Sequence, residues 1–452
     1  MEIPEPVGFL LDRLTGQGFE AYVVGGCVRD TLLGTAPGDW DICTSARPEE
    51  TEACFSDLRV VETGRKHGTV TVLQEGTSYE ITTFRRDGDY RDCRRPEQVA
   101  FVKELREDLA RRDFTVNAMA AGADGAVIDP FDGQEDLSRK ILRCVGDPDR
   151  RFQEDALRIL RGLRFAARLG FSLERETAAA MERNCGLLSH ISGERIYAEL
   201  TKLITGAHAA EVLLQYGKIL LPVLPEIGPA MGCLQYNPCH DKDVWEHTLC
   251  ALGASPPDKI VRWTLLLHDL GKPDCFTMDS RGIGHFHGHP QRSAELAQNI
   301  MERLRVDKDT SEAVCELVRR HDDGSPVTRK AVRRWIARLG AERLRLLMQV
   351  KIADCLAHAD TPRTRQRYQD TMEFSGLVEQ VLREEDCFSV RDLKIGGKEV
   401  LACGAAPGPL VGSVLEQLFQ EVLDEQCENS EEALTARTKE ILLAGERTDH
   451  AD

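Results

Sequence analysis

The pattern of hydrophobic and polar positions changes once along the chain. Between residues 19 and 84, short runs rich in β-branched residues, such as 21–24 and 69–73, are bounded by Gly, Pro and Asp, which is typical of strands. Beyond about residue 147, apolar residues recur at helical spacing, as at Ile159 and Leu163. We therefore predict an α+β fold, with a small mixed sheet and its helices first and an all-helical remainder after it.

Two glycines follow the first expected strand. Gly25 and Gly26, in the run Gly-Gly-Cys-Val-Arg-Asp, leave backbone amides free to approach a triphosphate, and Arg29 supplies a charge partner. An isolated Gly-Gly pair is most often only a tight turn. The run gains weight from the acidic residues that follow it.

Three carboxylates come next in the same expected sheet. On a strand, Asp39 and Asp41 would point to one face about 7 Å apart, a separation at which they can hold a pair of hard divalent cations for phosphoryl transfer. Glu80 lies on a later strand that could run alongside. An isolated Asp-x-Asp is usually a solvated turn, but the ordered set of strand, glycine turn, Asp-x-Asp and Glu-bearing strand is specific.

This ordered set resembles the class II tRNA nucleotidyltransferases, a family of CCA-adding enzymes and bacterial poly(A) polymerases, and the resemblance continues through residues 111–119 (RRDFTVNAM) and 129–137. It implies a polymerase-β-like nucleotidyltransferase head in which Asp39, Asp41 and Glu80 hold two Mg²⁺ ions. Arg112, like Arg29, would hold triphosphate charge, and Asp113 would contact the ribose. The implied partners are tRNA, CTP and ATP, and no DNA is expected.

A basic helix is expected from about residue 154 to 170. One face carries a stripe of arginines opposite apolar residues; it consists of Arg158, Arg161, Arg164 and Arg168. An exposed face with Glu154 and Arg158 paired at i, i+4 would explain the stripe without a ligand. The family pattern Glu-Asp-x-x-Arg implies instead a nucleotide-binding helix. Asp155 would accept the exocyclic amine shared by C and A, and Arg158 would donate to ring acceptors.

Two segments bear on which member of the family this is. Residues 85–112 hold nine bases and seven acids; such a run is most often a solvated loop, but in the family a loop of this form accompanies ATP addition and is lacking in CC-only enzymes. Residues 63–72, which include Lys66 and His67, resemble the CCA-adding branch. We predict template-independent addition of CMP and AMP to the tRNA 3′ end. An A-adding enzyme or a poly(A) polymerase is the alternative.

A second constellation lies among the histidines, nine of which fall between residues 190 and 321. Its order of His, His-Asp, His, His and Asp resembles the HD superfamily of helical metal-dependent phosphohydrolases. A lone His on an apolar helix is more often a satisfied core residue, but six ordered positions argue for a site binding a divalent transition metal. The resemblance implies a primary set, with a second set beside it; these are His247, His268, Asp269 and Asp354, and then His289 and His321.

The role of this second constellation is open from the sequence. It could hydrolyse phosphate at damaged or cyclic-phosphate tRNA ends, or the domain could serve chiefly to bind tRNA. From another functional class, the chain could be an HD phosphohydrolase whose head only binds RNA. The chain keeps the head carboxylates and the expected base-recognising residues Asp155 and Arg158, which a head that only binds RNA would not need. This counts against that last interpretation.

The positions of prolines indicate the domain boundaries, and the net charge excludes one class of protein. Prolines near residues 222–229 and 407–409 mark boundaries, and we predict a nucleotidyltransferase head at 1–145, a neck and body at 146–225, an HD domain at 226–360 and a helical tail at 361–452. The net charge of −17 over 452 residues excludes a basic nucleic-acid module read from bulk charge. Almost half of it lies in residues 416–452, with 11 acids and 3 bases, so we do not expect this tail to contact phosphate.

Local charge and cysteine usage indicate partners and compartment. Residues 139–175 and 319–351 carry net charges of +5 and +7, which makes them candidate tRNA-phosphate surfaces; solvated helix faces are the alternative. Fifteen scattered cysteines without a Cys-x-x-Cys pair fit thiols in a reducing cytosol. No signal sequence or run of ~18 apolar residues is present, so we predict a cytoplasmic protein with no membrane partner.

Overall fold

The structure is a computed structural model that describes residues 1–65, 68–87, 99–384 and 389–448. The chain forms two compact units: Met1–Gly228 with Ile300–Val306, and Pro229–Asn299 with Asp307–Asp452. The four-part division expected from the sequence is finer and stays a prediction. Lys66, His67 and residues 88–98 of the basic loop, on which part of the family assignment depended, lie outside the described residues.

The first unit contains a seven-stranded mixed sheet with the strand order β3-β4-β5-β2-β1-β8-β9. All neighbouring pairs are antiparallel except β2 and β5, which run parallel. Shorter ladders join β6 to β7 and β10 to β11. The strands are β1 (Ala21–Val24), β2 (Ile42–Thr44), β3 (Arg59–Gly64), β4 (Thr69–Gln74), β5 (Thr77–Thr83), β6 (Arg85–Asp87), β7 (Val99–Phe101), β8 (Ala120–Ala121), β9 (Val127–Ile128), β10 (Ile141–Leu142) and β11 (Ser172–Leu173).

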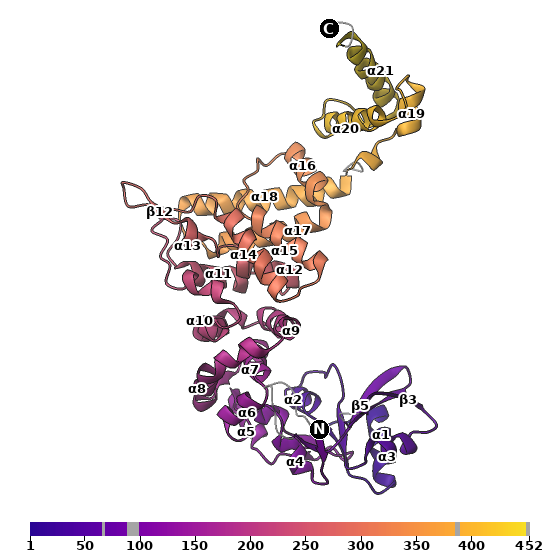
Figure 1. Cartoon of the computed structure of the whole chain (residues 1–452), viewed down its shortest axis with the longest axis vertical. Helices are drawn as coiled ribbons and strands as arrows, with labels where there is room; N and C mark the ends of the chain where they lie inside the picture. The colour runs from indigo at the N-terminus through magenta and orange to yellow at the C-terminus, as the bar shows by residue number, and fades with distance from the viewer. Residues whose placement is uncertain (66–67, 88–98, 385–388, 449–452) are drawn as a thin grey trace. The chain divides into compact units, whose positions relative to one another are not determined.

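Helices pack against this sheet and then continue without it, as the indigo-to-magenta part of Figure 1 shows. α7 contacts α9 and α10 and is buried over most of its length. The helices are α1 (Glu5–Gly16), α2 (Gly26–Leu32), α3 (Pro48–Cys54), α4 (Leu105–Ala110), α5 (Gly133–Arg139), α6 (Pro148–Glu154), α7 (Leu157–Leu169), α8 (Arg175–Asn184), α9 (Gly193–Ile204) and α10 (Ala209–Tyr216). The α+β fold class is confirmed.

The single helix expected from residue 154 onward is wrong in one detail. α6 ends at Glu154, and Asp155 has extended backbone angles (φ −139°, ψ 102°) before α7 begins. Its carboxylate accepts a hydrogen bond from the backbone N–H of Leu157. This local side-chain bond satisfies a free amide at the start of α7 and favours a break over a continuous helix.

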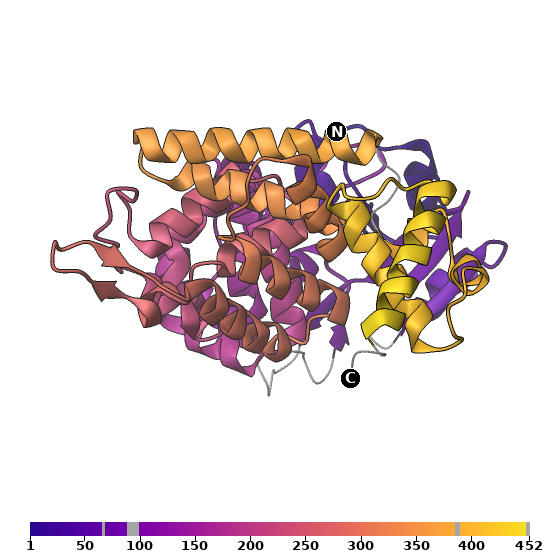
Figure 2. The same cartoon turned by 90° about the horizontal axis from the view of Figure 1, so that it is seen from above.

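The second unit is almost entirely helical, with one short hairpin of β12 (Thr277–Met278) and β13 (Gly284–His285); Figure 2 shows its helices from above. No helix in the described part of the chain is both long and apolar enough to cross a membrane. The helices are α11 (Val244–Ala254), α12 (Lys259–Leu267), α13 (Lys272–Cys275), α14 (His289–Arg303), α15 (Lys308–Arg320), α16 (Arg329–Leu339), α17 (Ala341–Ala357), α18 (Pro362–Glu384), α19 (Gly397–Ala402), α20 (Pro409–Leu423) and α21 (Glu431–Thr448).

Two hydrophobic clusters organise the later part of this unit. One joins α15, α16, α17 and α18 around fully buried side chains such as Val332 and Val381. The other joins α19, α20 and α21 around Leu418 and Leu434. The first cluster holds α17 and α18 together.

Candidate active sites

Three carboxylates meet where β2 and β5 run in parallel. Asp41 immediately precedes β2, and the register of the two strands places it beside Glu80 on β5. Burial first, and then the like charges of Asp39 and Glu80, raise the pKa of Asp41, while Arg112 opposes the rise. Repulsion of this kind is relieved by a divalent cation, so the carboxylates fit the Mg²⁺ site that the sequence predicts.

The details of this site differ from the expectation. β2 begins only at Ile42, so Asp39 and Asp41 lie in an extended segment before the strand rather than on it. Asp39 and Glu80 are exposed and Asp41 is half-buried. Among the described residues, sets of three metal-ligand atoms within 4.8 Å of one another occur only in the second unit. The head carboxylates therefore form an open site that a cation would have to draw together.

The glycine turn lies next to an arginine. Gly25 has φ 83°, a left-handed angle that favours glycine, and a Cβ there would lie 2.9 Å from Nη1 of Arg112, which would then have to shift. Gly26 begins α2. Nε of Arg112 is buried without a hydrogen-bond partner, although its Nη2 donates to Asp108 (3.3 Å). This orphaned donor beside the turn is suited to a phosphate oxygen.

Arg29, the expected charge partner for a triphosphate, is buried and already paired within the protein. Its side chain is 3% exposed, and its guanidinium donates to the carboxylate of Asp30 (2.8 Å) and to the side-chain oxygen of Asn117. The guanidinium also lies 5.2 Å from the centre of the Phe165 ring. Arg29 thus ties α2 to neighbouring segments, and its contact with triphosphate stays a prediction.

Asp113 is also engaged within the protein. Arg161 donates to its Oδ2 (2.8 Å), and Asn117 donates to its Oδ1 (3.1 Å). Burial alone would raise the pKa of Asp113, but Arg161, Asn117 and Arg158 lower it to about 2. The carboxylate is therefore ionised at neutral pH and holds Arg161 in place, while its contact with the ribose stays a prediction.

Asp155 and Arg158, the two residues expected to recognise the base, lie at the break between α6 and α7. Asp155 is half-buried, and burial raises its pKa although Arg195 lies 3.5 Å away. Arg158 donates to Glu154 (3.0 Å) and to the backbone oxygen of Arg111 (2.8 Å). The i, i+4 pair expected from the alternative interpretation is thus present, and it also fixes the direction of the Arg158 guanidinium.

The arginine stripe is a set of partly buried ion pairs rather than an open cationic face. Arg161 pairs with Asp113, and Nε of Arg164 lies 3.2 Å from Glu199 and its guanidinium 4.3 Å from the Phe165 ring. These contacts hold the arginine side chains in fixed orientations. A nucleotide would meet donors that are already positioned, which lowers the entropy cost of binding.

The second candidate site brings together six side chains from five helices. His247 lies on α11, His268 and Asp269 follow α12, His289 begins α14, His321 follows α15 and Asp354 lies on α17. All six are buried. Two sets have ligand atoms within 4.8 Å of one another: His247, His268 and Asp354, and His268, Asp269 and His321.

The four histidines share one hydrogen-bond pattern. Each Nδ1 lies within hydrogen-bond distance of a backbone carbonyl, which favours the proton on Nδ1 and leaves Nε2 with a lone pair toward the centre. The pairs are His247 with Ala357 (3.3 Å), His268 with Leu265 (2.6 Å), His289 with Phe286 (2.9 Å) and His321 with Val318 (2.7 Å). Nε2 of His289 and Nε2 of His321 lie 3.3 Å apart. Two lone pairs at that distance repel unless a proton or a metal lies between them.

The charges of this site also fit a metal. Nε2 of His268 and both oxygens of Asp269 are buried without a hydrogen bond of good geometry, although Nζ of Lys272 lies 2.7 Å from Asp269. Burial alone would lower the pKa of His268, but Asp269 and Asp354 raise it to about 10, so without a metal its Nε2 carries a proton in the place that a cation would take. The centre therefore attracts positive charge, and its imidazole and carboxylate donors fit a divalent transition metal.

Several residues of this site were not predicted from the sequence. Lys272 donates to Gln235 (2.8 Å) as well as pairing with Asp269, and the rings of His240 and His358 each lie 5.1 Å from that of His247. Lys272 comes three residues after Asp269, one helical turn on, which is a signal that could have identified it. His240 and His358 approach only through tertiary packing, and no local pattern marks them.

The basic segment 319–351 is largely paired within its own unit. On α16, Arg333 pairs with Glu425 (2.6 Å), and Arg334 and Lys330 pair with Asp424 (2.6 and 3.3 Å). The acidic tail thus neutralises part of α16. This pairing counts against an open tRNA-phosphate surface on α16, and the alternative of solvated helix faces did not include it.

Comparisons with known proteins identify the families to which the parts of the chain are similar. Three family models match: the poly A polymerase head domain over residues 21–143, the probable RNA- and SrmB-binding site of polymerase A over 170–231, and the HD domain over 245–359. The CCA-adding enzyme of Geobacillus kaustophilus is 36% identical over 94% of this chain and 94% of its own length. That of Geobacillus thermodenitrificans is 48% identical over 58% of this chain and 62% of its own length.

A solved structure gives the same result. The crystal structure of the Bacillus stearothermophilus CCA-adding enzyme in complex with CTP aligns with a TM-score of 0.74 and 30% identity, and covers 99% of this chain and 100% of that one. Its similarity spans head, helical body and tail alike. The chain therefore belongs to the family of CCA-adding enzymes, which are nucleotidyltransferases.

Proposed function

We propose that this protein completes tRNA 3′ ends by adding CMP and AMP from CTP and ATP at one centre in its head. The observation that carries the proposal is the meeting of Asp39, Asp41 and Glu80 beside the orphaned donor of Arg112. Family membership supports tRNA, CTP and ATP as partners, and the related structure in complex with CTP agrees with one of them.

The head residues divide the reaction between them. Asp39, Asp41 and Glu80 would hold Mg²⁺, which supplies Lewis acidity to the attacking hydroxyl and the departing pyrophosphate. The tRNA 3′-hydroxyl gives up its proton to solvent, and its oxygen forms a bond to the α-phosphorus as the bond to pyrophosphate breaks. Arg112 would hold the triphosphate.

Base selection would come from the protein rather than from a nucleic-acid template. The half-buried carboxylate of Asp155 would accept from the exocyclic amine of C or A, and Arg158, fixed by Glu154 and the Arg111 carbonyl, would donate to the ring. Uracil has no amine at the corresponding position, and guanine carries its amine elsewhere, so both bases would be rejected.

The experiment that tests this function uses tRNAs that end before, within or after the CC sequence. Incubation of the purified chain with CTP, ATP or both should extend the first substrate by CCA and leave a complete tRNA unchanged. Addition of A only to tRNAs that already end in CC would identify an A-adding enzyme, and repeated A addition would identify a poly(A) polymerase.

We also infer a second activity at the histidine-rich site. The Nε2 atoms that face the centre and the buried Asp269 carboxylate, which makes no hydrogen bond of good geometry, favour a resident divalent transition metal, which would activate water against a phosphoester. A 2′,3′-cyclic phosphate at an RNA end is the proposed substrate: water adds to phosphorus, one ring P–O bond breaks, and the released ribose oxygen takes the proton. Metal content and cyclic phosphodiesterase activity should both be lost in the double variant His268→Ala, Asp269→Ala; activity that survives it belongs to another site.

The compartment belongs to the proposal as well. Every described cysteine is a free thiol, which agrees with a cytoplasmic enzyme. Measurement of free thiols in the freshly isolated protein should therefore account for all fifteen cysteines.

A further inference from the structure

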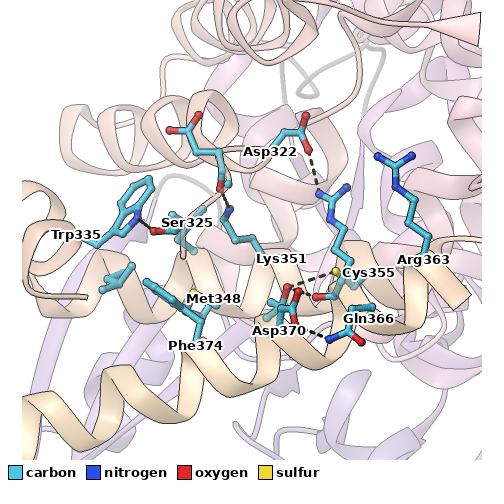
Figure 3. A pocket seen from close by; sticks show the side chains of 16 residues that line it. Asp322, Ser325, Trp335, Met348, Lys351, Cys355, Arg363, Gln366, Asp370 and Phe374 are labelled. Carbon is cyan, nitrogen blue, oxygen red and sulfur yellow. Dashed lines mark hydrogen bonds and ion pairs between the residues drawn. The ribbon is translucent and has the colours of Figure 1, made fainter. Parts of the chain in front are cut away.

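A cavity of about 610 Å³ lies beside the histidine-rich site, and neither proposed activity uses it. It is enclosed by the loop between α15 and α16 and by one face each of α16, α17 and α18. Figure 3 shows Trp335 and Phe374 toward one end of the view and Arg363 and Gln366 toward the other. Its walls therefore combine an aromatic end with a polar part that carries both cations and carboxylates.

The aromatic end presents fixed surfaces. The indole N–H of Trp335 donates to the hydroxyl of Ser325 (2.9 Å), which holds the ring in one orientation. Phe374 and Met348 belong to the buried cluster that joins α16, α17 and α18, so they form a rigid wall. Such surfaces suit the flat face of a nucleobase, and stacking on them does not depend on the base.

The polar end offers cations with remaining donor capacity. In the part of the chain that the structure describes, Arg363 makes no hydrogen bond or ion pair. Lys351 donates one hydrogen bond there, to the backbone oxygen of Asp323. Gln366 donates to Asp370 (2.7 Å), so amide and carboxylate groups also stand at the wall and can pair with hydroxyl or amino groups. This mixture fits a phosphorylated nucleoside better than a simple anion.

The cavity adjoins the histidine-rich site through one ion pair. Arg367 and Asp322 line both this cavity and a second one, of about 280 Å³, onto which His289, His321 and Asp354 open. Nη2 of Arg367 lies 3.0 Å from Asp322 and 3.5 Å from Asp354. A ligand whose phosphate reaches Arg367 would therefore stand at the edge of the proposed metal centre.

We propose that this cavity binds the nucleoside of the substrate hydrolysed at the histidine-rich site, with the base against Trp335 and Phe374 and the phosphate held by Arg363 and Arg367. The proposal rests on the hydrolytic activity inferred above. The terminal nucleotide of an RNA and a free nucleotide share this chemistry, so the test includes both sources.

The first test measures binding without hydrolysis. The full chain is titrated calorimetrically with 2′,3′-cyclic AMP in the presence of EDTA, as wild type, Arg363→Ala and Arg365→Ala. Arg365 is the matched control, because it lies on the same helix, pairs with Asp360 and does not line the cavity. We expect Arg363→Ala to weaken binding by about tenfold or more, as for loss of a charge-assisted contact, and Arg365→Ala to leave it unchanged. The head's nucleotide site is identical in all three proteins, so the difference reports on the cavity.

The second test addresses the base end and the source of the ligand. Trp335→Leu should raise the KM for 2′,3′-cyclic AMP and leave the hydrolysis of a ribose 2′,3′-cyclic phosphate without a base unchanged, with a thermal melt to verify folding. A tRNA ending in a cyclic phosphate is assayed beside the free nucleotide; an Arg363→Ala effect on either one supports the cavity as the nucleoside site and identifies the source.

The two proposals fail in different ways. Binding that depends on Arg363 without any hydrolysis would overturn the hydrolytic activity and leave the cavity as a nucleotide site. Hydrolysis with an unchanged KM in Arg363→Ala, together with unchanged binding in EDTA, would overturn the cavity proposal.

Discussion

The two candidate sites differ in burial and in the rigidity of their ligands. The head carboxylates Asp39 and Glu80 are exposed, and all the ligand atoms there are oxygens. At the histidine-rich site all six side chains are buried, and each histidine is oriented by a backbone carbonyl. One site is open and incomplete without a cation, while the other is assembled in advance.

From this difference we infer which metal each site should hold and how tightly it should bind that metal. Mg²⁺ keeps several waters and binds through one or two carboxylates together with substrate phosphates, so the head site should gain its ions with the nucleotide. Buried imidazole and carboxylate donors in fixed orientations suit a resident transition metal that is slow to leave. The predictions below test this contrast.

The largest expected effect is at the head. Asp39→Ala should lower CMP and AMP incorporation by about 10³-fold, because loss of a metal ligand removes several kcal/mol of transition-state stabilisation. Asp12→Ala, an exposed carboxylate on α1, is the control and should leave the rate unchanged. Incorporation of labelled nucleotide and tRNA binding are measured in parallel. Robust incorporation by Asp39→Ala would contradict the metal site.

Metal removal separates the two sites directly. After dialysis against a chelator, addition of Mg²⁺ should restore nucleotide incorporation in full, because the head binds its ions only with substrate. Cyclic phosphodiesterase activity should return only with a transition metal such as Mn²⁺, Co²⁺ or Ni²⁺. Recovery of both activities with Mg²⁺ alone would show that the histidine-rich site has no preference for softer ions. This result would contradict the proposed difference in metal preference between the two sites.

The sequence predicted which residues come together at the two sites, but not every detail of the local structure around them. The meeting of Asp41 with Glu80 could be expected from strand alternation and from the family motif, and the convergence of the six His and Asp residues from their order. The break at Asp155 could not, because a single side-chain hydrogen bond to Leu157 overrides the helical periodicity around it.

Long-range packing explains the remaining differences. The sequence marks Arg29 as a cation beside a glycine turn, but it does not show that Arg29 is buried and donates to Asp30 and Asn117. Arg367 approaches Asp354 from a separate helix, and no spacing along the chain marks that approach. Local patterns thus predicted the candidate ligands, whereas the groups that orient them became visible only in the structure.

A smaller effect concerns the stability of the head behind its exposed carboxylates. The pKa of Asp113, about 2, lies below the value of about 3.9 for an unfolded Asp. The ionised carboxylate therefore contributes about 2 kcal/mol of stability above pH ~4, which is lost as the pH falls through ~2. The difference in free energy of unfolding between wild type and Asp113→Asn should shrink over that window. A difference independent of pH would show that Asp113 acts through packing rather than charge.

The smallest effect is expected where the acidic tail meets α16. Asp424 pairs with Arg334 and Lys330 in the second unit, and Arg334 is 55% exposed, so solvent screens the pair. Asp424→Asn should therefore lower the free energy of unfolding only slightly, and this loss should disappear in 1 M salt because the Debye length falls to about 3 Å. Asp309→Asn, an exposed carboxylate on α15 without an ion pair in the described chain, is the control. A loss of stability that persists in high salt would mean that apolar contacts hold the tail to α16, such as that of Ala337 with the cluster of α19, α20 and α21. The acidity of the tail would then serve another purpose.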